Sequence, residues 1–377
     1  MKALLLGCGE IGKEALRDLY HYGIFEEIIV GTRTMANSSR FIASLNGRPG
    51  KIKEVQIDIS DTDAVAGLMK GCTVAVNCAG PNYKYELPVA YAAIKARVPL
   101  IDVNDEYEIT YKMYDLDEAA KDAGIPIIFG LGGAPGIDNV LVRAAADQLD
   151  EVDEIHTAWI MSGADPGGFA LSQHLLYSLS GKAYTLEGGI MKEKRSFIDG
   201  SEILEFPAPV GKVEVFHIGH PEPITLSRSY PSAKIVDNKA TFIPSLVNQS
   251  ILELGKLVRD ATGPVRINGS SVEAMDFAAA ELLKRCKNLT AVAPEAALMV
   301  RLTGRKKGKT KKITFSSVGR LGPATGVPAS IGAIMVAQGK IHLRGSMPPE
   351  VCIEPHDFLY EVLDRRNLAK LNGWVED

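Results

Sequence analysis

The sequence has few cysteines and no cysteine pattern. Its five cysteines are Cys8, Cys72, Cys78, Cys286 and Cys352, and no Cys-x-x-Cys pair occurs among them. The absence of paired spacing excludes a disulfide framework and a zinc ribbon. It is typical of proteins kept in a reducing compartment, so we expect a cytoplasmic protein.

Long apolar runs and a strong charge of either sign are also missing. No apolar stretch approaches the roughly 20 residues that span a bilayer, and the opening run at residues 3–6 stops at a glycine turn. The formal net charge is only -4. We therefore predict neither a membrane nor a nucleic acid as partner.

The composition is otherwise that of a globular protein. The chain has 377 residues, of which 46 % are hydrophobic and 23 % charged. This length exceeds what one ordinary hydrophobic core supports, so we expect two domains.

The most informative segment is a glycine motif at the N-terminus. An apolar strand leads into Gly7-Cys8-Gly9-Glu10-Ile11-Gly12, and a helical pattern follows at once. In a dinucleotide-binding turn Gly7 permits the tight turn and Gly9 lets the backbone approach a pyrophosphate. Gly12 allows close contact between helix and strand, and Glu10 and Ile11 open the helix whose N-terminus faces the anion. We predict dinucleotide binding here.

The residues at the end of the second strand narrow the choice of cofactor. Residues 26–31 form a strand that begins with two glutamates and is apolar from Ile28 on. It leads to Thr32 and Arg33, with Ser38 close behind. An NAD-binding unit usually places a carboxylate at this point to hold the ribose hydroxyl. A guanidinium with nearby hydroxyls suits a 2′-phosphate instead, so NADP(H) is favoured over NAD(H). The alternative is that Arg33 is a solvated loop residue.

The pattern of expected strands and helices differs between two parts of the chain. Residues 1–135 alternate strand and helix, which predicts an α/β, doubly wound parallel Rossmann sheet. Residues 136–324 contain helices and strands of alternating hydrophobicity, which predict an α+β domain on a mixed or antiparallel sheet for substrate and dimerisation. Residues 107–123 read as one long helix.

Ligands of such a sheet lie at the carboxyl ends of the strands, so the residues after each strand are candidates. Asp58 and Ile59 follow the third strand and are placed to meet the adenine. The alternative for Asp58 is a helix cap. The fourth strand leads to a predicted ribose and nicotinamide contact, for which a plain turn is the alternative; its residues are Cys78, Ala79, Gly80 and Pro81.

Polar side chains further along are candidates for catalysis. Tyr83 could orient a carboxylate or an imine, although it could equally lie in the first turn of a helix. Asp105 follows the fifth strand among other carboxylates and could attract a cationic amine, or it could cap a helix. His174 could act as an acid or base near neutral pH, or lie on a half-buried helical face.

Two further patterns are ambiguous or weak. His217 and His220 have a spacing seen in metal sites, but no further cysteine or carboxylate ligand accompanies them, so we predict no metal. Residues 305–312 carry six basic residues between two alternating strands. A solvated hairpin tip is the favoured interpretation, and an anion- or partner-binding hairpin is the alternative.

With these segments in hand, the chain resembles the saccharopine dehydrogenase-like oxidoreductases, which include saccharopine reductases and lysine 6-dehydrogenases. The resemblance rests on the glycine turn, Arg33 and several short motifs. These motifs are Asn77-Cys78-Ala79-Gly80-Pro81, residues 132–139, residues 325–330, Gly345 and Pro349-Glu350.

The resemblance implies a Rossmann domain at 1–135 completed by about 325–377, a second domain at 136–324, and a homodimer. It also implies hydride transfer at the C–N bond of an amino acid or imine, with a lysine- or saccharopine-like small molecule as substrate. The rival hypothesis is a non-catalytic sensor that binds NADP(H) and reports its redox state.

Overall fold

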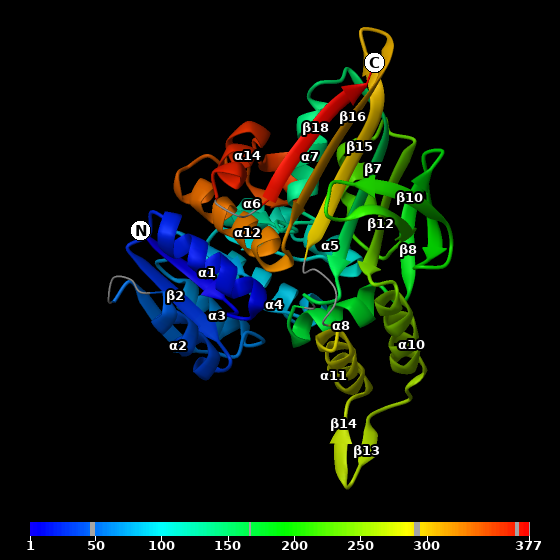
Figure 1. The fold of residues 1–377 in the computed structure, drawn as a ribbon. Helices are drawn as coiled ribbons and strands as arrows, with labels where there is room; N and C mark the ends of the chain where they lie inside the picture. Colours follow the sequence, from blue (N-terminus) through cyan, green and yellow to red (C-terminus); the bar gives the residue numbers. More distant parts are fainter. Residues whose placement is uncertain (46–49, 166, 290–294, 366–368, 377) are drawn as a thin grey trace. The chain divides into compact units, whose positions relative to one another are not determined.

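The structure is a computed structural model that describes residues 1–45, 50–165, 167–289, 295–365 and 369–376 (Figure 1). The chain forms two compact units, each described by itself. The first comprises Met1–Val140 with Gly322–Leu368, and the second Leu141–Leu321 with Ala369–Asp377. We expected residues of about 325–377 to complete the Rossmann domain, but the strand that begins at Ala369 belongs to the second unit.

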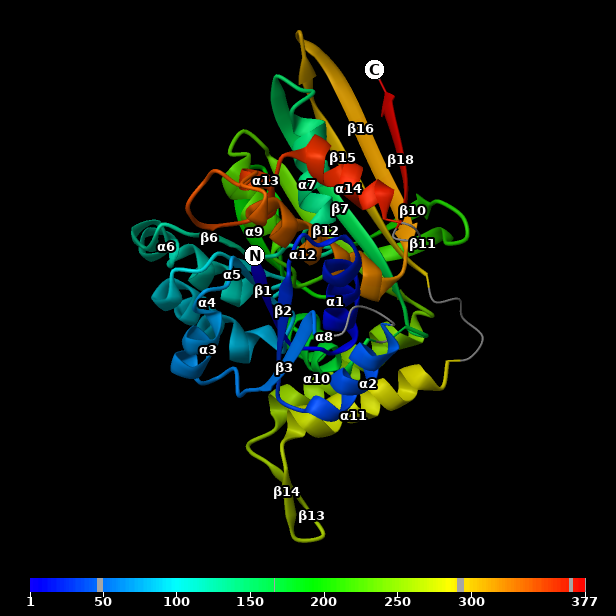
Figure 2. The same ribbon diagram turned by 90° about the vertical axis from the view of Figure 1, so that its left-hand side faces the viewer.

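The first unit contains a parallel sheet of seven strands, as the alternating pattern predicts. The strand order is β17-β6-β5-β4-β1-β2-β3. Strands β2 and β3 are therefore added on one side of β1 and the later strands on the other, so the strand order reverses between β1 and β4, which pair in parallel. Figure 2 shows β1, β2 and β3 side by side. The strands are β1 (Lys2–Leu6), β2 (Glu27–Thr32), β3 (Ile52–Gln56), β4 (Val74–Asn77), β5 (Leu100–Asp102), β6 (Pro126–Ile128) and β17 (Gly345–Met347).

The central strand β1 is apolar without alternation because helices cover both faces of a parallel sheet. Leu4, Leu5 and Leu6 are fully buried. The helices of the first unit are α1 (Glu10–Tyr22), α2 (Met35–Ser44), α3 (Thr62–Met69), α4 (Asn82–Ala96), α5 (Tyr107–Tyr114), α6 (Asp117–Ala123), α12 (Leu321–Ala337), α13 (Pro349–Cys352) and α14 (Pro355–Asp364). Helix α7 (Ile137–Ala146) spans the boundary between the two units.

Helices from the C-terminal part of the chain complete this unit. A Cβ on Gly326 of α12 would lie 2.5 Å from the carbonyl oxygen of Ile11, so α12 lies directly against α1. Ser330 of α12 also donates a 2.7 Å hydrogen bond to Asp18 of α1. The single helix expected over residues 107–123 is wrong, because the chain turns at Asp115 and Leu116 and divides it into α5 and α6.

The second unit is built on a mixed sheet. β12 (Ile235–Ile243) pairs in parallel with β7 (Glu151–Ser162), and the other pairings are antiparallel. The order is β10-β11-β12-β7-β15-β16-β18, with β8 beside β12 and β9 beside β8. The remaining strands of this sheet are β8 (Lys182–Glu187), β9 (Ile190–Arg195), β10 (Ser201–Phe206), β11 (Gly211–His217), β15 (Ala296–Lys306), β16 (Lys309–Gly319) and β18 (Ala369–Glu376).

Helices and a small hairpin complete the second unit. One core cluster on the sheet includes Ile160, Phe206, Val215 and Met299. The helices are α8 (Phe169–Ser178), α9 (Glu222–Ser229), α10 (Leu246–Asp260) and α11 (Ala274–Lys287), and the hairpin is β13 (Val265–Ile267) with β14 (Ser270–Val272). Among the residues that the structure describes, no helix is long and apolar enough to cross a membrane.

Candidate functional site

The glycine turn lies between β1 and α1, at the point where the strand order reverses. Gly7 has φ +84°, and a Cβ there would lie 2.8 Å from the backbone of Ala79. A Cβ on Gly12 would lie 2.0 Å from the carbonyl oxygen of Gly7, so α1 can approach the turn only with glycine at this position. These contacts agree with the packing roles predicted for the two glycines.

Gly9 differs from its neighbours because open space surrounds it. A Cβ on Gly9 would meet no atom within 4 Å, and Gly9 is the N-cap of α1 without a side-chain cap. The first backbone N–H groups of a helix lack partners within the helix and attract anions. The turn therefore fits a pyrophosphate. Glu10 is exposed and pairs with Lys13, while Ile11 is half-buried.

The loop after β4 borders this turn. The backbone N–H of Cys78 donates to Leu6 of β1 at 2.9 Å, and that of Ala79 donates to Oδ1 of Asn77 at 3.2 Å. Gly80 is half-buried, and Pro81 is buried as the N-cap of α4. Burial raises the pKa of the Cys78 thiol, so it remains neutral.

Arg33 and Thr32 stand at the carboxyl end of β2. The Arg33 guanidinium is exposed, and its charge contributes to lowering the pKa of the nearby Asp58 carboxyl group. An exposed cation at this place is able to meet a 2′-phosphate. Ser38 is only 1 % exposed, and its hydroxyl donates to the carbonyl of Met35 within α2, so its cofactor role stays a prediction.

Asp58 and Ile59 follow β3. Asp58 is exposed, and its carboxylate accepts hydrogen bonds from the backbone and the hydroxyl of Ser60. These bonds, and further the charge of Arg33, lower the pKa of Asp58. The helix cap considered for Asp58 is provided by Asp61 instead, whose carboxylate accepts from the first turn of α3. Ile59 is half-buried against the core.

Tyr83 lies in the first turn of α4, as the alternative interpretation had it. Its ring is half-buried and packs against the core of the first unit. The neighbouring Asn82 donates from Nδ2 to Oδ1 of Asp105 at 3.0 Å, so the first turn of α4 is linked to the loop after β5.

The carboxylates after β5 have unequal surroundings. Asp102 and Glu106 are fully buried, and only Asp105 of the three is half-buried. Asp105 does not cap a helix, because its carboxylate accepts from Asn82, and Glu106 is the N-cap of α5 without a side-chain cap. Of these carboxylates, Asp105 is therefore the one that stays a candidate for attracting a cationic amine.

A buried carboxyl pair that the sequence did not reveal lies beneath this loop. Glu86 of α4 and Asp102 are both 0 % exposed, and each carboxyl group shifts the pKa of the other. Burial raises the pKa of Glu86 well above its usual range and that of Asp102 to about 6. The raised pKa favours the protonated form of Glu86.

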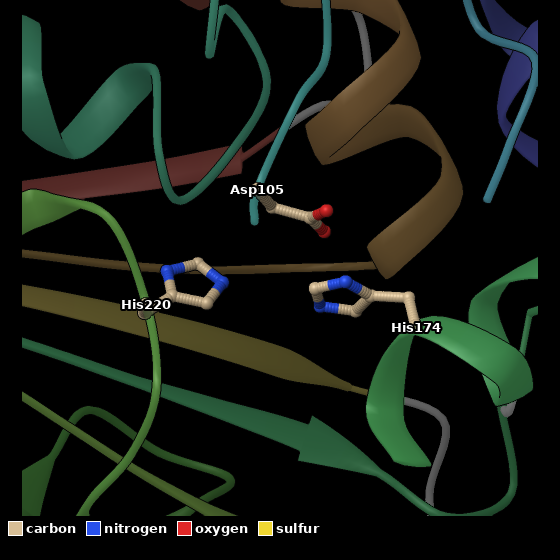
Figure 3. Close-up of side chains that lie close together, drawn as sticks. All are labelled: Asp105, His174 and His220. Carbon is tan, nitrogen blue, oxygen red and sulfur yellow. The ribbon is translucent and has the colours of Figure 1, made fainter. Parts of the chain in front are cut away.

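His174 in the second unit has an aromatic and polar neighbourhood. It lies on α8 and is only 4 % exposed, and its ring is T-shaped to that of His220 with centroids 6.2 Å apart. A ring nitrogen of each histidine lies within 4.8 Å of the other (Figure 3). Asp105, also drawn in Figure 3, belongs to the first unit.

His220 is held by a buried carboxylate. Its Nδ1 lies 2.6 Å from Oε2 of Glu222, and these side chains are 2 % and 0 % exposed. The ring also lies against Trp159 of β7 at 5.3 Å between centroids. From the sequence, His220 was notable only for its spacing from His217, which is seen in metal sites. Its proximity to His174 depends on tertiary structure. His217 ends β11, where burial lowers its pKa.

The basic run at residues 305–312 forms the hairpin that its pattern predicts. β15 and β16 pair through Lys306 and Lys309, and Lys307 and Gly308 form the tip at positive φ. Arg305 pairs with Asp153, and Lys306 with Asp150.

The comparisons with known proteins agree with this geometry. Residues 3–128 match the family model of the saccharopine dehydrogenase NADP binding domain. The match includes every predicted cofactor residue and supports NADP(H) as the cofactor. It confirms, over these residues, the resemblance drawn from the motifs.

Curated relatives extend the likeness. A carboxyaminopropylagmatine dehydrogenase from Synechocystis sp. is 23 % identical over 389 residues, covering 95 % of this chain and 94 % of the relative. An NADP(+), L-glutamate-forming saccharopine dehydrogenase from Pyricularia oryzae is 24 % identical over 155 residues, covering 41 % of this chain and 31 % of that protein. Both relatives are dehydrogenases.

A solved structure aligns with most of the chain. The DAP dehydrogenase of C. glutamicum in complex with DAP is 14 % identical, with a TM-score of 0.48 and coverage of 97 % of this chain and 99 % of that one.

Proposed function

We propose that the protein is an NADP(H)-dependent oxidoreductase that transfers hydride at the C–N bond of an amino acid or imine. The observation that carries the proposal is the open glycine turn at the β1–β4 reversal, within residues that match an NADP binding domain. The full-length likeness to a dehydrogenase supports turnover. A lysine- or saccharopine-like substrate is the first class to test.

The cofactor preference follows from the end of β2. Arg33 presents an exposed guanidinium where an NAD-specific protein usually has a carboxylate. A guanidinium forms charge-assisted hydrogen bonds to a phosphate, which supports NADP(H) over NAD(H).

Three side chains are proposed to act on the substrate. When bound, NADP(H) supplies the hydride donor or acceptor. The carboxylate of Asp105 attracts the cationic amine, and the hydroxyl of Tyr83 orients a carboxylate or an imine. His174 takes up the proton that the amine releases on oxidation, or returns it in the reverse direction.

The structure adds His220 to this proposal. Because Nδ1 of His220 lies against the Glu222 carboxylate, a proton is held on Nδ1 and Nε2 is left as the basic nitrogen. With His174 close by, the two rings form a short path for a proton within the second unit.

An assay of turnover separates the enzyme from the sensor. NADPH absorbance is followed with a panel of amino acids in one direction and of keto acid and amine pairs in the other. The proposal expects substrate-dependent change with one lysine- or saccharopine-like compound. NADPH binding without turnover on any compound in the panel would favour the sensor.

We further propose a cytoplasmic homodimer. No disulfide joins the five cysteines, all of which lie in the described part of the chain, and this is consistent with a reducing compartment. Light scattering on the purified protein measures the oligomeric state, and a monomer at micromolar concentration would contradict the dimer.

A further inference from the structure

We propose that Glu86 is a positioning residue of the cofactor site: its carboxyl group shares a proton with Asp102 and so holds Asn77 and the loop after β4 against the glycine turn. The inference rests on the cofactor site of the proposed function and not on the C–N chemistry. It concerns only residues of the first unit.

The pair can exist only with a proton. Both Glu86 oxygens are buried, and no N–H or hydroxyl donor of the described residues reaches them. Two ionised carboxylates in contact would repel each other in a medium of low dielectric constant. One carboxylic acid and one carboxylate instead form a short, charge-assisted hydrogen bond.

The structure indicates which partner is ionised. Asp102 accepts a 2.7 Å hydrogen bond from Nδ2 of Asn77 and a 2.9 Å bond from the backbone N–H of Asn104. Both bonds stabilise a negative charge on Asp102. Glu86 has neither, so Glu86 holds the proton and donates it to Asp102.

The chain of bonds continues to the cofactor loop. Because Asp102 binds Nδ2 of Asn77, the amide of Asn77 is turned so that Oδ1 accepts the N–H of Ala79. Gly7 lies against the backbone of Ala79, and a Cβ on Gly7 would be only 2.8 Å from that backbone. Glu86 thus acts on the glycine turn through Asp102, Asn77 and Ala79.

The other charges near Glu86 act in the same direction. Besides Asp102, the carboxyl groups that raise the pKa of Glu86 are those of Glu106 and Asp105 in the loop before α5. The neighbouring Cys78 thiol stays neutral because burial raises its pKa. As pH rises through the raised pKa of Glu86, the shared proton is lost and repulsion replaces the hydrogen bond. Affinity for NADPH should therefore fall over that interval.

The test compares E86L and E86Q in the full-length protein by calorimetric NADPH titration without substrate. The amide introduced by E86Q donates to Asp102 at every pH, so we expect a Kd within about twofold of the wild type and no alkaline weakening. E86L removes the donor, and we expect the Kd to rise about tenfold, the size of one hydrogen bond to a charged group. Comparison at equal pH cancels titration of the cofactor phosphate.

Stability is measured beside affinity. Replacing a buried carboxyl by leucine can leave stability unchanged or raise it, so a weaker Kd with an unaltered melting temperature identifies positioning. The control is V65A, which creates a cavity in the core of the same unit and should lower its stability. We expect V65A to leave the Kd unchanged.

A double-mutant cycle tests the route through Asn77. If Glu86 acts through Asn77, N77L and E86L together should weaken binding no more than N77L alone. Wild-type affinity in E86L, or equal loss in E86L and E86Q, would overturn the inference. Failure of the wild-type protein to bind NADPH would instead refute the cofactor site itself.

Discussion

Asp18 on α1 accepts a 2.9 Å hydrogen bond from Nε of Arg365, although 347 positions separate the two residues. The side chains are 4 % and 6 % exposed, and Ser330 of α12 donates to the same carboxylate. Burial raises the pKa of Asp18 despite these partners. These hydrogen bonds connect α1 to the C-terminal part of the first unit. Burying the Asp18 carboxylate to form them costs desolvation free energy.

Breaking this pair should destabilise the first unit. Arg365→Leu leaves the Asp18 carboxylate buried without its counter-charge, and we expect unfolding free energy to fall by about 3–5 kcal/mol. Urea denaturation measures the change. The control is Lys95→Leu, which removes an exposed pair with Asp63 and should change stability by less than about 1 kcal/mol. Equal effects would show that the buried pair is not important.

A large side chain at Gly9 should abolish cofactor binding. A Cβ on Gly9 would meet no atom within 4 Å, so Gly9→Glu should fold, but its carboxylate should occupy the pyrophosphate space and repel the anion. Gly67→Glu makes the same change on an exposed, equally open helical position and should bind normally. Tight NADPH binding by Gly9→Glu in calorimetry would exclude the glycine turn as the site.

A carboxylate at position 33 should reverse the cofactor preference. Arg33→Asp removes the proposed phosphate partner and adds repulsion, so NADPH binding should weaken by more than about 1.5–3 kcal/mol while NADH binding is retained. Lys112→Asp changes the charge equally at an exposed position of α5 and serves as control. An unaltered ratio of NADPH to NADH affinity would contradict the assignment.

The proposed catalytic residues should affect turnover more than binding. Tyr83→Phe, Asp105→Asn and His174→Gln each remove one polar function with little change of volume, and an asparagine at 105 still accepts from Asn82. We expect turnover to fall about 10²–10⁴-fold where the residue transfers a proton, with NADPH affinity retained. His21→Gln, at an exposed position of α1, is the control. A residue whose variant keeps full turnover has no catalytic role.

Local sequence determined the parts of the fold that depend on neighbouring residues. The close packing at Gly7 and Gly12 could be predicted because a glycine turn of this type is contained within six residues. The strand–helix alternation could be predicted because periodicity reflects burial. β12 was not predicted. Its Asp237 and Asn238 are buried polar residues that hydrogen-bond to His156 and Thr157 of β7, so the segment lacks the apolar pattern of a central strand.

Tertiary structure alone decided which polar groups meet. The Glu86–Asp102 pair, the Asp18–Arg365 ion pair and the approach of His174 to His220 each join segments that are distant in sequence. Their stability depends on burial and on partners supplied by another strand or helix. A local pattern cannot encode these pairings, because the free energy of a buried polar group is set by the atoms that surround it.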